Sequence, residues 1–194
     1  MKHFHSNVNC LLSCIAYSLL FVLLGCNNER KEVSANICKL TNHDVIVPYD
    51  KLLLYEGRYA LYEYTMLEPL NLVVYVDNSE CSSCYLSNIQ RWEPFLDSLR
   101  LNYDYVRTTI LFTPSNEVQN SFFEKLRYTK FKYPLYIDTC NVFSRTNRHI
   151  PSNKMYHTFL IDENNKVILV GNPLTNKKIN KMFWKILDEN RNKY

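Results

Sequence analysis

A pair of cysteines stands between a strand-like run and a helical pattern, and this junction constrains the fold more than any other feature. Residues 72–76 form an apolar run rich in valine, which predicts a buried strand. Cys81 and Cys84 follow, and apolar residues at helical spacing continue to residue 101. Two thiols separated by two residues on the first turn of a helix can close a disulfide or bind a soft metal ion. The sequence therefore predicts redox or metal chemistry at this junction.

The N-terminal residues predict a location outside the cytosol. Residues 1–9 contain Lys2 and no acidic residue, and residues 10–24 are almost wholly apolar, which is typical of a signal peptide. Leu23-Leu24-Gly25-Cys26 resembles the bacterial lipobox, in which Cys26 becomes lipid-modified. We therefore expect residues 1–25 to be a lipoprotein signal peptide, with an uncleaved N-terminal anchor as the alternative. The expected location is the bacterial cell envelope, lipid-anchored at the periplasmic face or the outer membrane.

The rest of the chain is expected to hold one folded domain. Hydrophobic residues make up 46% of the 194 residues and aromatic residues 14%, which predicts an aromatic-rich core and argues against disorder. The formal net charge of +4 is too small to indicate a nucleic-acid partner. Residues 26–40 are largely polar and predict a tether, which leaves residues 41–194 as the domain.

Two further cysteines, Cys38 and Cys140, lie outside both the signal segment and the pair. In an oxidising compartment they can form a second disulfide, and each can equally be a buried small hydrophobic residue. The sequence leaves both possibilities open.

Hydrophobic periodicity predicts alternating strands and helices. Before the cysteine pair we expect an N-terminal pair of strands within residues 43–67 and a central strand over residues 71–77. After it we expect a helix over 82–101, broken near 90–93 by Pro94, and then a strand over 104–112. The next helix is expected to run from an N-cap at Ser115 to about Thr129, with Val118 facing inward. The remaining elements are a strand over 133–137, a helical turn over 141–148, a hairpin of strands over 157–162 and 166–170, and a helix over 176–189 with Met182 facing inward. This order implies an α/β fold with a mixed sheet flanked by helices on both faces.

Three motifs together resemble one known family. They are Val73–Val76 before the cysteine pair, Tyr133–Asp138, and Thr158–Ile168, which is similar to a hairpin of the form TFLID followed by a turn. On these motifs, residues 70–190 resemble a thioredoxin-like domain of the TlpA/ResA type, the membrane-anchored redoxins of the bacterial envelope. The resemblance implies a thioredoxin-like mixed sheet, here with an N-terminal β extension.

The family resemblance also implies an activity, namely thiol–disulfide exchange without a cofactor. Cys81 would be the exposed nucleophile, its thiolate favoured by the amide groups and dipole of the helix N-terminus. Cys84, one turn further along, would be the resolving thiol that releases the substrate. The implied partners are protein disulfides, a membrane electron donor, and the membrane itself through the lipid on Cys26.

Three residues depart from the family's pattern around the cysteines. Tyr156 stands where the family places a cis-proline, and a cis bond before a non-proline residue costs about 3–4 kcal/mol, so a trans bond is expected and the substrate groove changes. Tyr75 replaces the buried carboxylate of thioredoxins, and Glu80 replaces an aromatic residue. We expect Glu80 either to oppose thiolate formation at Cys81, which would make the pair a weaker nucleophile and less oxidising, or to relay protons.

Two other functions are compatible with the same residues. The disulfide can be structural, in a non-catalytic interaction module that keeps the fold, because a fold does not determine a function. Alternatively, Cys81 and Cys84 with His157 form a soft ligand set for Cu(I), similar to that of the Sco-type copper chaperones.

Overall fold

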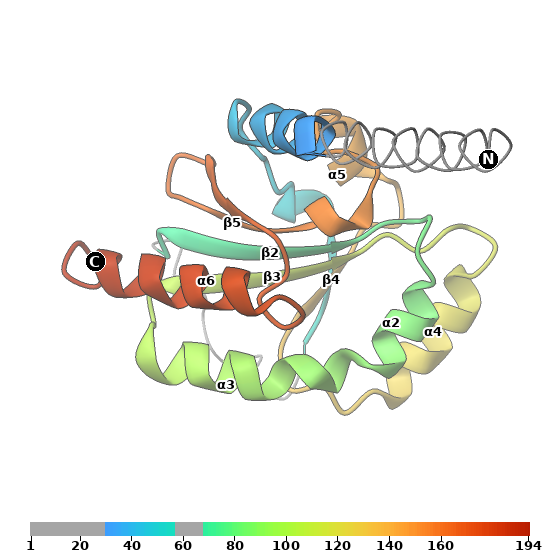
Figure 1. Cartoon of the computed structure of the whole chain (residues 1–194). Coiled ribbons are helices and arrows are strands. Elements are labelled where there is room, and N and C mark those ends of the chain that lie inside the picture. Colours follow the sequence, from blue (N-terminus) through green and yellow to red (C-terminus); the bar gives the residue numbers. More distant parts are fainter. Residues whose placement is uncertain (1–29, 57–67) are drawn as a thin grey trace, which may run out of the picture. The chain divides into compact units, whose positions relative to one another are not determined.

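The computed structural model describes residues 30–56 and 68–194 (Figure 1). The chain divides into two compact units, Met1–Cys38 and Lys39–Tyr194. Residues 30–41 are helical, and the predicted signal peptide with Cys26 lies outside the described residues. None of the helices in the described ranges combines the length and the apolar character needed to span a membrane.

Strands and helices alternate along the second unit. In chain order the elements are η1 (Tyr49–Lys51), β1 (Leu53–Tyr55), β2 (Leu70–Val76), α2 (Ser82–Ser87), η2 (Ile89–Trp92), α3 (Glu93–Asn102), β3 (Val106–Phe112), α4 (Gln119–Tyr128), β4 (Leu135–Ile137), α5 (Val142–Thr146), η3 (Lys154–Tyr156), β5 (Thr158–Ile161), β6 (Val167–Val170) and α6 (Lys177–Asn190).

The strands described here form one six-stranded mixed sheet in the order β1-β4-β3-β2-β5-β6. Strands β2, β3 and β4 run parallel, whereas β1, β5 and β6 pair antiparallel with their neighbours. Strand β2 is central, and its Val74 lies opposite Ile110 of β3 and Thr158 of β5. The predicted α/β class, mixed sheet and central strand are confirmed.

Each face of the sheet carries its own hydrophobic cluster, because side chains alternate between the faces along a strand. Leu72, Val74 and Val76 of β2 belong to a first cluster with residues of α2, α3, α4 and α6. Val73 and Tyr75 belong to a second cluster with Phe143 of α5 and with Leu40 and Val45 of the N-terminal segment. Figure 1 shows α3 and α5 on opposite sides of the sheet, so the prediction of helices on both faces is confirmed.

The predicted helix over residues 82–101 is broken into three pieces: α2, η2 and α3. Pro94 lies in the first turn of α3, where the backbone N–H that proline lacks would have no partner within the helix. The break predicted near residues 90–93 is therefore confirmed, and Pro94 starts a new helix there.

Two details of the later helices differ from the predictions. Helix α4 begins at Gln119, because residues 116–118 form a turn in which the Val118 N–H donates to the Ser115 carbonyl at 3.1 Å. Ser115 is therefore not the N-cap, and Val118 is exposed. In α6, Met182 is also exposed, while Phe183 and Leu187 fill the core.

The N-terminal extension contributes one described strand, β1, which pairs with β4 at the edge of the sheet. The run Val45–Val47 was expected to be a strand, but the structure does not place it in one. The backbone N–H and carbonyl of Ile46 instead bond to the side chain of Asn147, at 2.9 Å each. Of the other two runs in the region of the expected strand pair, residues 52–55 contain β1, whereas residues 59–66 fall outside the described ranges.

Candidate redox site

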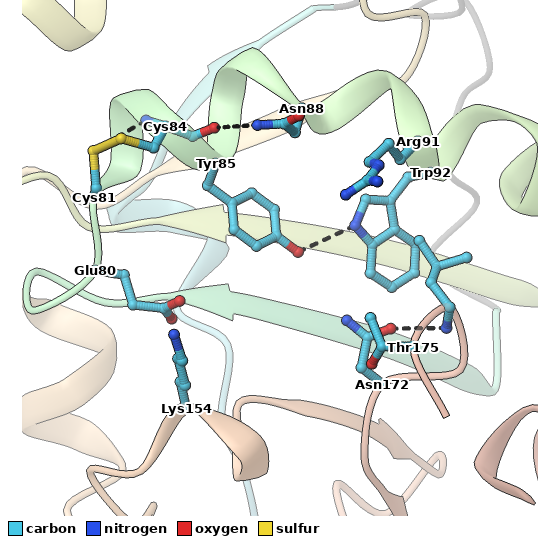
Figure 2. A pocket seen from close by; sticks show the side chains of 11 residues that line it. Glu80, Cys81, Cys84, Tyr85, Asn88, Arg91, Trp92, Lys154, Asn172 and Thr175 are labelled. Atoms are coloured by element: carbon cyan, nitrogen blue, oxygen red, sulfur yellow. Dashed lines mark hydrogen bonds between the residues drawn. A yellow bond between two sulfur atoms is a disulfide. The ribbon is translucent and has the colours of Figure 1, made fainter. Parts of the chain in front are cut away.

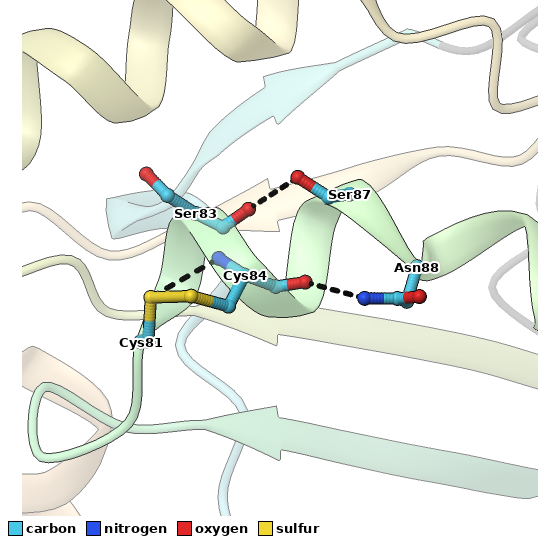
Figure 3. The surroundings of a disulfide bond; sticks show 5 residues. All are labelled: Cys81, Ser83, Cys84, Ser87 and Asn88. Atoms are coloured by element: carbon cyan, nitrogen blue, oxygen red, sulfur yellow. Dashed lines mark hydrogen bonds between the residues drawn. A yellow bond between two sulfur atoms is a disulfide. The ribbon is translucent and has the colours of Figure 1, made fainter.

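A tight turn connects the end of β2 to the cysteine pair. The Asp77 carboxylate accepts hydrogen bonds from the backbone N–H groups of Ser79 and Glu80, at 3.0 and 3.2 Å. The turn delivers Cys81 to the N-cap position of α2, and Cys81 and Cys84 form a disulfide with their Cα atoms 5.2 Å apart (Figure 3). Of the two chemistries that the spacing allows, the structure thus has the disulfide.

The two sulfur atoms differ in their hydrogen bonding and resemble each other in exposure. Both cysteines are exposed, so accessibility alone does not select the nucleophile. The backbone N–H of Cys84, however, donates to the Cys81 sulfur at 3.2 Å. A hydrogen bond to sulfur favours the charged form of a thiol. This contact supports the assignment of Cys81 as the attacking thiolate after reduction.

Side chains along α2 stabilise this short helix from its polar side. Ser87 donates to the Ser83 carbonyl at 2.9 Å, and the Asn88 amide donates to the Cys84 carbonyl at 3.0 Å (Figure 3). On the opposite side, Leu86 is buried in the first cluster. The helix therefore holds the cysteine pair at a defined position against the sheet.

The disulfide opens onto a cleft of about 630 Å³. Its lining residues come from α2, η2, η3 and the segment before α6: Glu80, Cys81, Cys84, Tyr85, Asn88, Arg91, Trp92, Lys154, Asn172, Leu174 and Thr175 (Figure 2). The Trp92 indole N–H donates to the Tyr85 hydroxyl at 3.1 Å. Burial raises the pKa of Tyr85 to about 12, so its phenol is neutral at physiological pH. The cleft thus presents aromatic surface and two cations, with Lys154 near Glu80 and Arg91 near Trp92 (Figure 2).

Tyr75 does not replace the buried carboxylate of thioredoxins as a proton acceptor. Its ring packs against Phe143 and His157, with centroids 4.8 and 5.1 Å away. Burial raises the pKa of Tyr75 to about 12, which keeps the phenol protonated. Tyr75 therefore acts as a packing residue of the second cluster and does not line the cleft.

Tyr156 was expected to border the substrate groove, but it is 2% exposed and packs in the second cluster. Among the described residues the backbone contains no cis peptide bond, in agreement with the trans bond expected here. Lys154, two residues earlier in η3, lines the cleft in its place. Because the Tyr156 side chain is buried, the side chain at this edge of the cleft is the cation Lys154.

Glu80 and His157 face each other. The Nδ1 atom of His157 lies 3.6 Å from a Glu80 carboxylate oxygen, and the Nε2 atom lies 2.9 Å from the Pro151 carbonyl oxygen. His157 is 3% exposed and Glu80 is partly buried. The imidazole nitrogens are thus directed at Glu80 and Pro151, and the ligand set of Cys81, Cys84 and His157 is not assembled in the disulfide form.

Cys38 and Cys140 are both exposed, and no disulfide joins them. The structure therefore has neither a second bridge nor buried small hydrophobic residues at these positions. Cys140 follows β4 in a loop where its backbone N–H is bound by the Asp138 carboxylate at 3.1 Å.

Sequence reasoning missed most of the cleft. Arg91, Lys154 and Asn172 come from three separate segments that only the folded chain brings together. Asp77 was also missed, although its place directly after a central strand is a signal that could have found it.

No family model matches the chain, and no curated protein matches it. Among solved structures, it is similar to a conserved protein of unknown function from Bacteroides fragilis, with 11% identity and a TM-score of 0.44, covering 74% of this chain and 98% of that one. It is also similar to PrxQ of Xylella fastidiosa, with 18% identity and a TM-score of 0.40, covering 76% of this chain and 92% of that one.

The strand order itself defines the class of protein. A parallel strand–helix–strand unit with a Cys-x-x-Cys pair at the start of its helix is followed by an antiparallel hairpin and a closing helix. This is an α/β protein with a thioredoxin-like mixed sheet flanked by helices and extended by β1.

Proposed function

We propose that the chain is a thiol–disulfide oxidoreductase whose working group is the Cys81–Cys84 pair. The observation that carries this proposal is the exposed disulfide at the mouth of a cleft, with one sulfur accepting a backbone N–H. An accessible sulfur next to a binding surface is what exchange with a second molecule requires.

The reaction in the reducing direction has two steps. The Cys81 thiolate attacks one sulfur of a substrate disulfide, which forms a mixed disulfide and releases the first substrate thiolate to take up a proton. The Cys84 thiolate then attacks the Cys81 sulfur, which closes the protein disulfide and releases the second substrate thiol. Two electrons pass from the protein to the substrate, and a dithiol donor must return them before the next cycle.

The proposed location rests on the sequence features at the N-terminus, and the proposed partners rest on the family resemblance. We propose that lipid on Cys26 holds the domain at the bacterial cell envelope, that the substrates are disulfides of envelope proteins, and that the donor is a membrane protein. Labelling cells with a radioactive fatty acid tests the anchor: incorporation should disappear in Cys26→Ala.

Glu80 is expected to modulate this exchange. Its negative charge beside Cys81 disfavours a second negative charge on the sulfur. The rate of Cys81 alkylation against pH should therefore have a lower midpoint in Glu80→Gln than in the wild type. An unchanged midpoint would show that Glu80 neither opposes thiolate formation nor relays protons.

The reduction potential of the pair is the decisive measurement. Equilibration with glutathione buffers should give a potential above about −300 mV, whereas a structural bridge lies below that value. Cys84→Ser should accumulate a mixed disulfide with a model disulfide substrate, while Cys81→Ser should not. Cys140→Ser, which removes an exposed thiol elsewhere, is the matched control and should behave as the wild type.

A further inference from the structure

The hydrogen bond of His157 determines which of its nitrogens carries a lone pair. The Pro151 carbonyl oxygen can only accept a hydrogen bond, so the Nε2 atom, 2.9 Å away, must carry the proton. In the neutral imidazole the Nδ1 atom is then unprotonated and has its lone pair in the ring plane. A histidine whose second nitrogen is bound to a backbone carbonyl is the usual arrangement at protein metal sites.

The Nδ1 atom faces another acceptor. Its neighbour is a Glu80 carboxylate oxygen at 3.6 Å, and within the described ranges the buried Nδ1 atom has no hydrogen-bond partner. The side chain is 3% exposed, so water does not compensate it freely. The buried Nδ1 lone pair therefore faces the oxygen of a partly exposed carboxylate, and a proton or a cation between the two atoms would stabilise this arrangement.

Asp77 supplies a third ligand atom. One nitrogen of His157 and one carboxylate oxygen each from Asp77 and Glu80 all lie within 4.8 Å of one another. Zinc bonds to nitrogen and carboxylate oxygen are about 2.0–2.2 Å, which places tetrahedral ligands about 3.3–3.6 Å apart. The carboxylates are partly exposed, so their side chains have room to rotate toward that spacing and solvent can reach them.

We propose that Asp77, Glu80 and His157 bind a divalent metal ion such as Zn²⁺, and that the sulfur atoms of the neighbouring disulfide are not among its ligands. One imidazole and two carboxylates suit such a cation better than Cu(I), which prefers thiolates. Lys154 points toward Glu80 in Figure 2, so a metal ion bound by Glu80 must either move the Lys154 ammonium group away or bind next to it. The proposal does not depend on the redox activity, because the ligands are available while the disulfide is closed.

The test uses the full chain with the Cys81–Cys84 disulfide closed and all other thiols alkylated, so that no cysteine can bind metal. Titration with Zn²⁺ in a calorimeter should give one site, and Co²⁺ should give visible absorption bands that Zn²⁺ removes. Glu80→Gln and His157→Gln should each lower the affinity at least about tenfold. His43→Gln, which changes an exposed histidine outside the site, is the matched control and should bind as the wild type.

Three results would overturn the proposal: no Zn²⁺ binding, equal binding in the wild type and Glu80→Gln, or loss of binding in His43→Gln alone. Nitrogen NMR that finds a proton on His157 Nδ1 in the presence of Zn²⁺ would also overturn it, because the gap would then hold an imidazolium–carboxylate pair. If His157→Gln does not fold, Glu80→Gln and Asp77→Asn decide the matter, since both side chains are partly exposed. A reduction potential below about −300 mV would refute the proposed redox function, but it would not affect the metal-binding result.

Discussion

The two faces of the sheet differ in what they bury. On the face covered by α2, α3, α4 and α6, the first cluster is apolar, and the buried polar side chains there are hydroxyls such as Thr108 and Thr158. On the opposite face, Asp138, Asn147 and His157 are buried beside the second cluster. Apolar burial stabilises without directionality, whereas each buried polar group needs a specific partner. The first face therefore supports the helix that carries the cysteines through apolar packing, whereas the second face contains buried polar side chains that each need a specific partner.

The largest effect is expected from a truncation on the helix-covered face. Phe183 of α6 is fully buried, so Phe183→Ala should lower the free energy of unfolding by about 3–5 kcal/mol. Urea denaturation measures this loss, and the reduction potential of the cysteine pair should stay unchanged. Met182→Ala removes an exposed neighbour and should cost less than about 0.5 kcal/mol. Equal losses in both variants would contradict the assigned orientation of α6.

On the opposite face, the corresponding test replaces the buried polar residue Asp138. The buried Asp138 carboxylate accepts the N–H groups of Cys140 and Phe143, at 3.1 and 2.8 Å. Asp138→Asn replaces one acceptor oxygen with a donor, so unfolding should become easier by about 1.5–3 kcal/mol. Asp104→Asn, at an exposed position, is the control for the loss of charge. A stability equal to the wild type would mean that the loop before α5 does not need the carboxylate.

Reduction of the disulfide should have a smaller effect on stability. The bridge closes a loop of only four residues, and the chain-entropy model gives about 2 kcal/mol for such a loop. Urea denaturation with and without dithiothreitol measures the difference, and Cys81→Ser/Cys84→Ser should match the reduced wild type. A loss of 4 kcal/mol or more would indicate a structural bridge and weaken the proposed exchange function.

The smallest expected effect is a dependence of the melting temperature on pH, caused by His149. Burial, followed by the charges of His43 and Lys39, lowers the pKa of His149 below 6.5, and the His43 ring stacks on it at 4.9 Å. A histidine with a lowered pKa stabilises the fold above its unfolded pKa, and this stability is lost as the pH falls below about 6.5. The melting temperature should therefore fall between pH 7.5 and pH 5, and less so in His149→Asn. His43→Gln should be intermediate, and identical drops in all three proteins would refute the assignment.

Much of the fold was predictable because it depends on local patterns. The apolar run of β2, the hairpin of β5 and β6, and the interruption at Pro94 follow from periodicity and from the missing N–H of proline. The N-cap of α4 and the run Val45–Val47 were predicted wrongly. In both, the backbone found partners that periodicity does not reveal: a turn at Ser115 and the distant side chain of Asn147.

The sequence by itself determined that a cysteine pair opens a helix behind a central strand, because spacing and hydrophobic pattern are local properties. Only the tertiary structure decided what surrounds the pair. The register of β5 against β2 binds the Tyr75 N–H to the His157 carbonyl at 2.8 Å, and this contact brings His157 beside the turn that contains Asp77 and Glu80. Packing also turned Tyr75 and Tyr156 into the core and placed Lys154 at the cleft. Contacts between residues far apart in the chain depend on strand register and on which side chains the core has room for, and neither can be read from spacing.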